Sequence, residues 1–426
     1  MASTIIKQQA AQAAPGKTGT KPQESPSLLR QPRAVWAVVF ACIIAFMGLG
    51  LVDPILPAIA HKLNASASQV TLLFTSYNAV MAVAMLITGV LSSKLGMKGT
   101  LLTGIVIIAV FAALGGASNG IWPLIGLRGG WGLGNALFVA TSLTAIVTLS
   151  KSGTAKAIIL YEAAIGVGIS VGPLLGGELG SISWRGPFLG VAGLMVIAFI
   201  GLLILMPSAK KTPVLPGART AAASKPRVSL LDPFRTLKHR SILVLGIGAC
   251  LYNFGFITLM AYSPFVMGLD EHGLGYVFLG WGVLLALTSV FMAPKLQRKF
   301  GTVKSMCAML FLFGLVLLAM GIWTSTQWVI IAAVIFAGAL LGNNNTLITT
   351  AVMNAAPVER STASAAYSFL RFLGAAVAPY LAGKLSEWYN PHVPFIVGAG
   401  FVILAVVFIL LNRNYVKHVD NAASAH

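Results

Sequence analysis

Long uninterrupted apolar runs limit most strongly what this chain can fold into. A helix that crosses a hydrocarbon core of ~30 Å needs about 20 apolar residues, because each residue rises ~1.5 Å. Since lipid offers no hydrogen-bond partner, each such run must close its own backbone hydrogen bonds. We therefore predict an all-α integral membrane protein with twelve transmembrane helices. The runs cover residues 34–58, 70–92, 99–118, 121–147, 155–179, 186–207, 242–268, 274–294, 302–323, 327–353, 361–386 and 393–412.

Composition removes the main alternatives. The 426 residues are 57% hydrophobic and only 9% charged, whereas soluble domains are about 25% charged. The net charge of +19 would by itself suggest a nucleic-acid partner, which needs a basic, water-facing surface. The chain has too few polar residues to form one. We expect no nucleic-acid binding, no coiled coil and no wholly disordered protein.

The distribution of basic residues predicts the orientation. If both termini are cytoplasmic, the segments on that side hold 24 of the 29 Lys and Arg residues. Cytoplasmic loops of membrane proteins carry this excess. We predict a multi-pass protein of the inner or plasma membrane with both termini in the cytoplasm. Residues 1–33 lack the compact apolar stretch of a signal peptide and are interpreted as a disordered cytosolic tail, with a transit peptide as the alternative.

A linker rich in Pro, Lys and Arg, residues 208–241, separates two sets of six spans. This gives bundles at 34–207 and 242–412, followed by a cytosolic tail at 413–426. Four short patterns recur in order and at nearly constant spacing. Such parallel repeats build transporters whose site lies between the halves, so we predict two pseudo-symmetric six-helix bundles. The paired patterns are Leu91-x-x-Lys94-x-Gly96 with Leu296-x-x-Lys299-x-Gly301, Gly168-x-x-x-Gly172-Pro173 with Gly374-x-x-x-Ala378-Pro379, Leu133-Gly134-Asn135 with Leu341-Gly342-Asn343, and Asp53-Pro54 with Ser263-Pro264.

Four motifs resemble those of the major facilitator superfamily, and within it the twelve-span drug:proton antiporters. The most specific is the span 5 pattern G-x-x-x-G-P-x-x-G-G, which is complete. Two positions depart from the family: its loop acid is Ser93 here, and its span 4 Gln falls near Trp131. The motif residues are Gly89, Leu91, Lys94, Gly96 and Lys98 after span 2; Arg128, Gly132 and Gly134 in span 4; Gly168, Gly172, Pro173, Gly176 and Gly177 in span 5; and Gly48, Pro54 and Pro57 at span 1.

This resemblance implies an antiporter that exports small amphiphilic compounds, drugs or a secreted metabolite, in exchange for protons. It also implies that Arg128 assists proton transfer and that the first and fourth spans of each six-helix half line the cavity. The substrate-cavity candidates are then Trp131, Asn135, Tyr252, Asn253, Phe254, Phe256, Asn343, Asn344 and Asn345. We expect a monomer whose partners are a small-molecule substrate, protons and membrane lipids.

Two acids lie within the predicted spans, Asp53 and Glu162. An ionisable group inside a membrane costs about 3 kcal/mol or more and is a functional candidate by default. A carboxyl group whose surroundings alternate can load and release a proton, so both are candidates for proton coupling, together with Arg128. The alternatives are a cap near the outer surface for Asp53 and a static hydrogen bond for Glu162. Arg371 in span 11 fits either a gate contact or a structural ion pair.

Helix packing and gating involve a further group of residues. Gly168, Gly172 and Gly176 recur at every fourth position, which lets a neighbouring helix approach closely. Pro173 interrupts the hydrogen bonds of that span, and Pro54 and Pro57 predict a bend at the end of span 1. By the resemblance, Gly89 and Gly96 belong to the inner gate, to which Ser93 brings no charge.

The residues argue against an enzyme. All six His fall in predicted loops or tails, and the three Cys lie in spans, so no cluster has metal-ligand spacing. We expect no catalytic residue, no metal and no cofactor. Two other functions stay open on the same fold: a proton-coupled importer of a nutrient or osmolyte, and a lipid-handling flippase.

Overall fold

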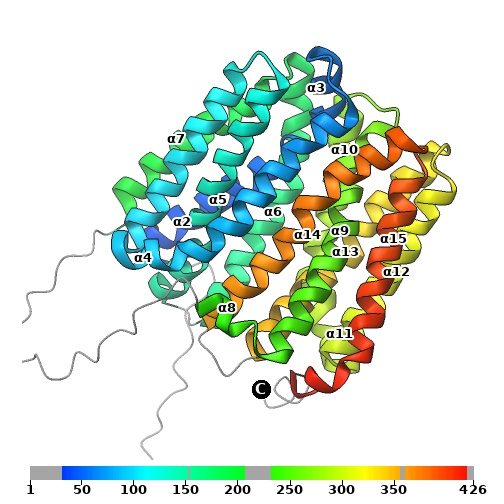
Figure 1. Cartoon of the computed structure of the whole chain (residues 1–426). Coiled ribbons are helices and arrows are strands. Elements are labelled where there is room, and N and C mark those ends of the chain that lie inside the picture. Colours follow the sequence, from blue (N-terminus) through cyan, green and yellow to red (C-terminus); the bar gives the residue numbers. More distant parts are fainter. Residues whose placement is uncertain (1–30, 152–153, 207–231, 356–359, 420–426) are drawn as a thin grey trace, which may run out of the picture.

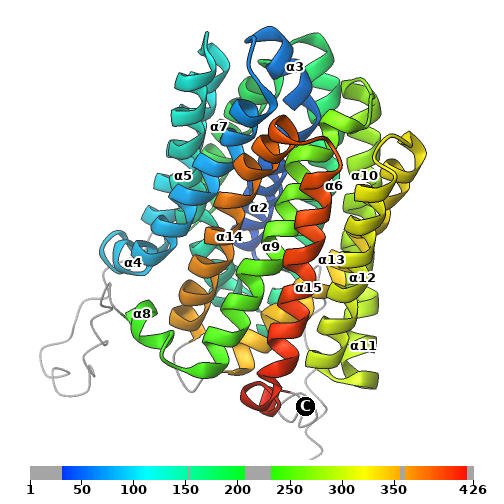
Figure 2. The ribbon, with the colours of Figure 1, turned by 45° about the vertical axis from the view of Figure 1, so that its right-hand side comes forward.

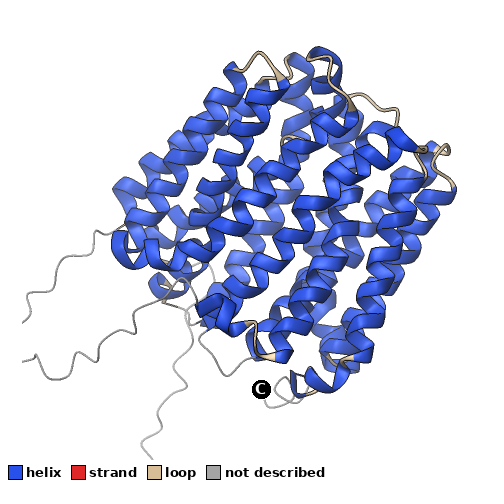
Figure 3. Cartoon of the chain, in the orientation of Figure 1, coloured by secondary structure: helices blue, strands red, loops and turns tan. Residues whose placement is uncertain are grey.

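The computed structural model describes residues 31–151, 154–206, 232–355 and 360–419, and all regular elements in these ranges are helical (Figures 1 and 3). Most of the expected tail at 1–33, residues 1–30, lies outside the described residues. The same holds for residues 208–231 of the expected linker at 208–241. The prediction of an all-helical membrane protein is confirmed.

The helices agree closely with the predicted spans. The N-terminal half contains α2 (Arg33–Gly50), η1 (Asp53–Ile55), α3 (Leu56–Lys62), α4 (Ala67–Ala117), α5 (Ile121–Leu149), α6 (Thr154–Ile182) and α7 (Gly186–Leu205). The C-terminal half contains α8 (Asp232–Thr236), α9 (Arg240–Val266), α10 (Glu271–Leu287), the π-helical turn η2 (Thr288–Met292), α11 (Ala293–Phe300), α12 (Thr302–Ile322), α13 (Gln327–Ala355), α14 (Arg360–Trp388), α15 (Val393–Leu411) and η3 (Arg413–Tyr415). In the described ranges, 11 helical segments are long and apolar enough to cross a membrane. One of them, α4, has 51 residues and contains two spans.

Two glycines mark the same turn in each half. Gly96 interrupts α4 with φ of 71°, and Gly301 separates α11 from α12 with φ of 84°. Residues with a Cβ atom rarely adopt this left-handed region, whereas Gly does so readily. These are equivalent positions of the recurring Leu-x-x-Lys-x-Gly pattern. The internal repeat read from the sequence therefore corresponds to a repeated backbone conformation.

Each half has its own hydrophobic core. One cluster of buried apolar side chains lies within residues 35–206, and a second lies within residues 242–419. Between the halves, α4 packs against α14 and α6 packs against α10 (Figures 1 and 2). Spans 2, 5, 8 and 11 thus form the boundary along which the halves meet.

The bundle has two distinct ends, which we call the α3 face and the α8 face (Figure 1). Large exposed aromatic residues gather near the helix ends of the α3 face, as membrane-interface belts do. They are Trp122, Tyr276, Trp323, Trp328, Trp388 and Tyr389. The α8 face carries basic side chains instead, including Lys94, Lys151, Lys295, Arg298 and Lys299. Apolar residues between the two faces, such as Ile197 and Leu404, are exposed as a lipid-facing surface requires.

The chain segment after α15 is partly folded. Val416 and Val419 are fully buried in the C-terminal core. Arg240 donates a hydrogen bond to the hydroxyl of Tyr415, and Nε2 of His418 lies 3.1 Å from the carbonyl oxygen of Ala355. The predicted tail at 413–426 therefore begins with a segment that packs across the α8 face, because its two valines complete the core.

Candidate functional site

Arg128 of α5 is the buried cation of the N-terminal half. Its side chain is only 3% exposed. The guanidinium carbon lies 4.1 Å from the ring centre of Trp131 and 4.9 Å from that of Tyr77. A desolvated cation–π contact of this kind contributes about 2 kcal/mol. Two aromatic faces therefore hold the charge in place.

Asp53 lies near this cation without contacting it. The residue is 3% exposed, and its Oδ1 atom has no hydrogen-bond partner. Asp53 and Arg128 interact electrostatically, but no ion pair within 4.0 Å joins them. Asp53 follows α2 and Arg128 lies in α5, and a direct pair would need the carboxylate to reach the guanidinium. The structure instead places Asp53 in η1, after the bend that the two prolines predicted, and leaves the guanidinium stacked on the rings.

A polar chain extends this cluster. The amide Nδ2 of Asn135 donates a hydrogen bond to the hydroxyl of Tyr77. Since Tyr77 also contacts Arg128, the chain links α4 to two turns of α5. The Oδ1 atom of Asn135 and the indole nitrogen of Trp131 have no partner. Tyr77 was missed in the sequence, because nothing along the chain reveals that α4 faces α5 at this point.

Glu162 and Arg371 form the second charged cluster, and they come from different halves. Glu162 of α6 and Arg371 of α14 interact electrostatically, without an ion pair within 4.0 Å. Both side chains are half-buried. The backbone carbonyl of Arg371 accepts a hydrogen bond of 3.0 Å from Asn253 of α9. The structure thus brings together an acid and a base that the sequence analysis considered separately.

Two tyrosines surround Arg371. Tyr367 precedes it by one helical turn on α14, and Tyr252 comes from α9. Both interact electrostatically with the guanidinium, and Tyr367 also has side-chain hydrogen-bonding interactions with Arg371 and Tyr252. Tyr367 was not predicted, although its i,i+4 spacing from a basic residue within a span was visible in the sequence.

The other cavity candidates are mostly buried and incompletely hydrogen-bonded. An unsatisfied buried polar atom costs about 1–3 kcal/mol, so a water or ligand is expected to pair with it. Phe256 is half-buried and stacks on Trp281, whereas Phe254 stacks on Phe401 inside the C-terminal half. Among these candidates, buried side-chain atoms without a hydrogen-bond partner belong to Trp131, Asn135, Asn253, Asn343, Asn344 and Asn345, and the indole nitrogen of Trp281 also lacks one.

The glycine ridge of α6 packs against α2. A Cβ atom at Gly168 would lie 2.6 Å from the carbonyl oxygen of Ile43, and one at Gly172 would lie 2.5 Å from that of Met47. Gly176 meets the backbone of Leu51 in the same way, and Pro173 contacts Gly50. The predicted close approach is present, and its partner is a helix of the same half.

The loop motif after span 2 has a structural role that the sequence did not reveal. Lys98 donates hydrogen bonds to the carbonyl oxygens of Leu203, at 2.9 Å, and Met206. The negative end of the α7 dipole also stabilises a cation at this position. Ser93 donates to Val90 of its own helix, and Gly89 is exposed on α4. Lys98 therefore binds the C-terminal end of α7 in addition to adding positive charge to this face.

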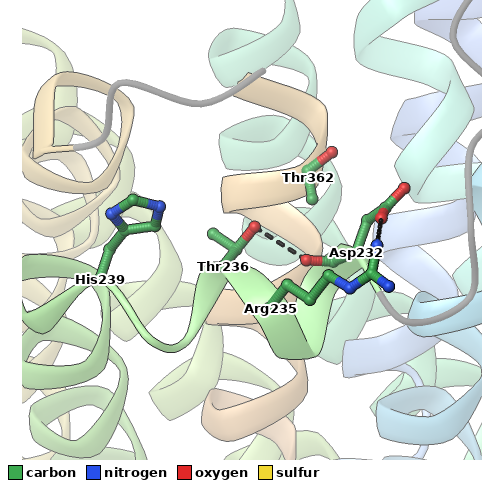
Figure 4. A pocket seen from close by; sticks show the side chains of 5 residues that line it. All are labelled: Asp232, Arg235, Thr236, His239 and Thr362. Atoms are coloured by element: carbon green, nitrogen blue, oxygen red, sulfur yellow. Dashed lines mark hydrogen bonds and ion pairs between the residues drawn. The ribbon is translucent and has the colours of Figure 1, made fainter.

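A separate pocket of about 260 Å³ opens at the α8 face (Figure 4). Its walls come from α8, from the turn before α9 and from Thr362 of α14. Arg235 and Asp232 form an ion pair of 3.6 Å there, and Thr236 donates to the Asp232 carbonyl. The polar groups of Asp232, Arg235 and Thr236 are therefore already paired with one another. No group of three or more His, Cys, Asp or Glu suited to a metal occurs in the described ranges.

Two repeated six-helix halves, with charged groups buried inside and between them, define a membrane transporter rather than an enzyme. The chain belongs to the Major Facilitator Superfamily, whose model matches residues 38–297 and 267–426. The sequence is 53% identical to the multidrug efflux protein YfmO of Bacillus subtilis over 96% of this chain and 99% of that protein. It is 24% identical to the quinolone resistance protein NorA of Staphylococcus aureus, covering 90% and 97% of the two chains. The fold also matches the human organic anion transporter MFSD10 with a TM-score of 0.65, at 18% identity, over 88% of this chain and 99% of that one.

Proposed function

We propose that this protein exports small amphiphilic compounds of the multidrug type in exchange for protons, by alternating access. Its similarity to YfmO over almost the whole chain supports the substrate class and the direction. One observation carries the proton coupling: Glu162 in one half and Arg371 in the other are close enough to interact electrostatically. A charge pair across the moving boundary can link protonation to the relative position of the halves.

The physical link is the loss of attraction on protonation. An ionised Glu162 attracts the guanidinium of Arg371, and this attraction is stronger inside the bundle than it would be in bulk water. A proton on the carboxyl group removes it and so favours separation of the two groups. Asp53 and Arg128 repeat the arrangement inside the N-terminal half, nearer the α3 face. We assign proton coupling to Asp53, Glu162 and Arg128, and a gating role to Arg371.

The unsatisfied polar atoms support the assignment of the substrate cavity. Amide and indole groups without partners, next to aromatic rings, suit ligands that are apolar with a few polar groups. We assign substrate contacts to Trp131, Asn135, Tyr252, Asn253, Phe256, Asn343 and Asn344. Gly168, Gly172, Pro173 and Gly176 keep α6 tightly on α2 while α10 moves on its other side. Both sides of the site come from one chain, so a monomer suffices.

The α8 face is proposed to be cytoplasmic, in the cell membrane. The excess of Lys and Arg at that face supports this orientation, since cytoplasmic segments are the basic ones. Both chain termini then lie in the cytoplasm. The α3 face, with its aromatic belt and few basic residues, is proposed to be the outer one.

The test is to remove each acid while keeping its shape. Glu162→Gln and Asp53→Asn keep hydrogen-bonding groups but cannot ionise. We expect each to reduce efflux of a fluorescent amphiphile driven by a pH gradient by more than about tenfold, which corresponds to ~1.4 kcal/mol. Asp270→Asn is the matched control, because this acid lies outside the spans and Asn also caps a helix.

Wild-type export rates in both acid variants, at equal expression, would contradict the proposed coupling. Uptake in place of efflux under the same gradient would favour a nutrient or osmolyte importer. Movement of labelled phospholipid between leaflets, without efflux, would favour a flippase.

A further inference from the structure

The two halves meet at the α3 face through a polar contact between α4 and α14. Ser68 lies in the first turn of α4, and Glu387 lies in the last turn of α14. The backbone N–H of Ser68 donates to Oε1 of Glu387 at 3.1 Å. The other carboxylate oxygen of Glu387 is 2.7 Å from Nζ of Lys384. A carboxylate of the C-terminal half therefore contacts the first turn of a helix of the N-terminal half.

A second contact joins α6 and α10 at the same face. Glu178 lies near the end of α6, and His272 is the second residue of α10. Nδ1 of His272 is 3.1 Å from Oε1 of Glu178. Both side chains are nearly half exposed, at 42% and 49%. A carboxylate of one half again meets the first turn of a helix from the other half.

The two contacts lie at corresponding helix ends of the two halves. The start of α4 and the start of α10 begin spans 2 and 8, and the ends of α6 and α14 end spans 5 and 11. Gly177 and Gly383 are separated by the same 206 positions as Gly168 and Gly374 of the recurring pattern. A Cβ atom at Gly383 would lie 2.5 Å from the Cα of Ser68, and Gly177 contacts the carbonyl oxygen of Glu271 equally closely. At both places a glycine brings the backbones together beside the carboxylate.

We propose that these two pairs, Ser68–Glu387 and Glu178–His272, form a latch that holds the α3 face closed and opens once in each transport cycle. This inference rests on the alternating-access function proposed above. Carboxylates are favoured at helix N-termini, where backbone N–H groups are unpaired. The Glu178–His272 pair is nearly half exposed, and the Glu387 side chain is 30% exposed. Polar pairs open to solvent are individually weak, so the latch can release during a cycle. The two contacts join the halves at both helix pairs of their boundary, α4 with α14 and α6 with α10.

Cross-linking the latch tests this directly. Glu178→Cys with His272→Cys, and Ser68→Cys with Glu387→Cys, are made after Cys42, Cys250 and Cys307 are replaced by Ser. A short reducible bis-methanethiosulfonate reagent should then reduce efflux to the level of membranes lacking the protein. Reduction should restore the rate seen before treatment.

A matched control lies at the same face but within one half. Arg185 donates a hydrogen bond of 2.7 Å to Asn119, and both belong to the N-terminal half. Cross-linked Asn119→Cys with Arg185→Cys should export as fast as the untreated protein. Full export by either cross-linked latch pair would overturn the proposal.

Weakening the latch gives a second, independent measurement. Glu178→Ala combined with Glu387→Ala should shift the spin-label distance between Lys62→Cys and Ser325→Cys toward longer values. These two label sites are exposed, lie at the α3 face and belong to different halves. The Arg185→Ala variant should leave the distribution unchanged. An unaltered distribution in the latch variant would contradict the proposal even if the cysteine pairs fail to reach the membrane.

The distance measurement needs neither substrate nor pH gradient, so it separates the two hypotheses. If the spin-label distance is unaltered but the acid variants do not export, the latch is rejected and proton coupling is retained. If the distance lengthens but the acid variants export fully, alternating access is retained and those acids are rejected as proton carriers.

Discussion

Arg128 keeps a guanidinium group inside the N-terminal half without an ion pair. Its planar group lies on Trp131 and beside Tyr77, and one of its terminal nitrogens has no hydrogen-bond partner. A planar cation can stack on a ring, whereas the compact ammonium of Lys is more strongly hydrated and cannot. The shape of the cation therefore matters as much as its charge.

This predicts that Arg128→Lys is not a conservative change. We expect proton-driven efflux to fall by more than about tenfold, because stacking is lost while the charge stays. The measurement is efflux from everted vesicles at equal expression. Tyr77→Phe should retain more activity, since it keeps the ring and loses only the hydrogen bond with Asn135. Equal rates for Arg128→Lys and wild type would show that charge alone suffices.

The sequence was informative about single residues only where a residue was unusual for its surroundings. Asp53, Glu162, Arg128 and Arg371 were identifiable because charges are rare inside apolar runs. Their partners were not, because they depend on which helices meet. Glu162 and Arg371 are more than 200 positions apart, and no local pattern relates them.

At the scale of the helix, α6 packs against a different helix on each of its two sides. Gly168, Gly172 and Gly176 pack on α2, whereas Gly177 packs on α10 of the other half. The four-residue spacing predicted one small-residue surface and close packing. It could not show which neighbour this surface would meet. The second contact surface depends on the arrangement of the two halves.

A methyl group at the ridge should destabilise the protein. In Gly172→Ala the new Cβ atom would be 2.5 Å from the oxygen of Met47, so α2 and α6 must separate. Overpacking of this kind costs about 1–3 kcal/mol. Gly193→Ala in α7 is the control, because no atom lies within 4 Å of its added Cβ. Thermal unfolding followed by tryptophan fluorescence should show a lower midpoint for Gly172→Ala alone.

At the scale of the whole molecule, duplication is what the sequence predicted best. Twelve apolar runs and four repeated patterns led to two six-helix halves, and the structure shows two cores and equivalent turns at Gly96 and Gly301. The contacts at the α3 face were not predictable. They arise from ordinary polar residues near helix ends, which carry no signal until both halves are placed together.

The proposed orientation makes a simple labelling prediction. A membrane-impermeant maleimide should label Ser325→Cys in intact cells, because this residue is exposed at the α3 face. It should label Lys299→Cys, exposed near the α8 face, only after permeabilisation. The reverse pattern would place the α8 face outside and reject the orientation.

The most direct test of proton-driven export is a flux measurement on purified protein in liposomes. With the membrane potential clamped, a pH gradient that is acidic at the α3 face should drive a fluorescent amphiphile out through that face. Reversing the gradient should reverse the flux, and Glu162→Gln should remove the dependence on the gradient. A wild-type flux that ignores the pH gradient would contradict the account.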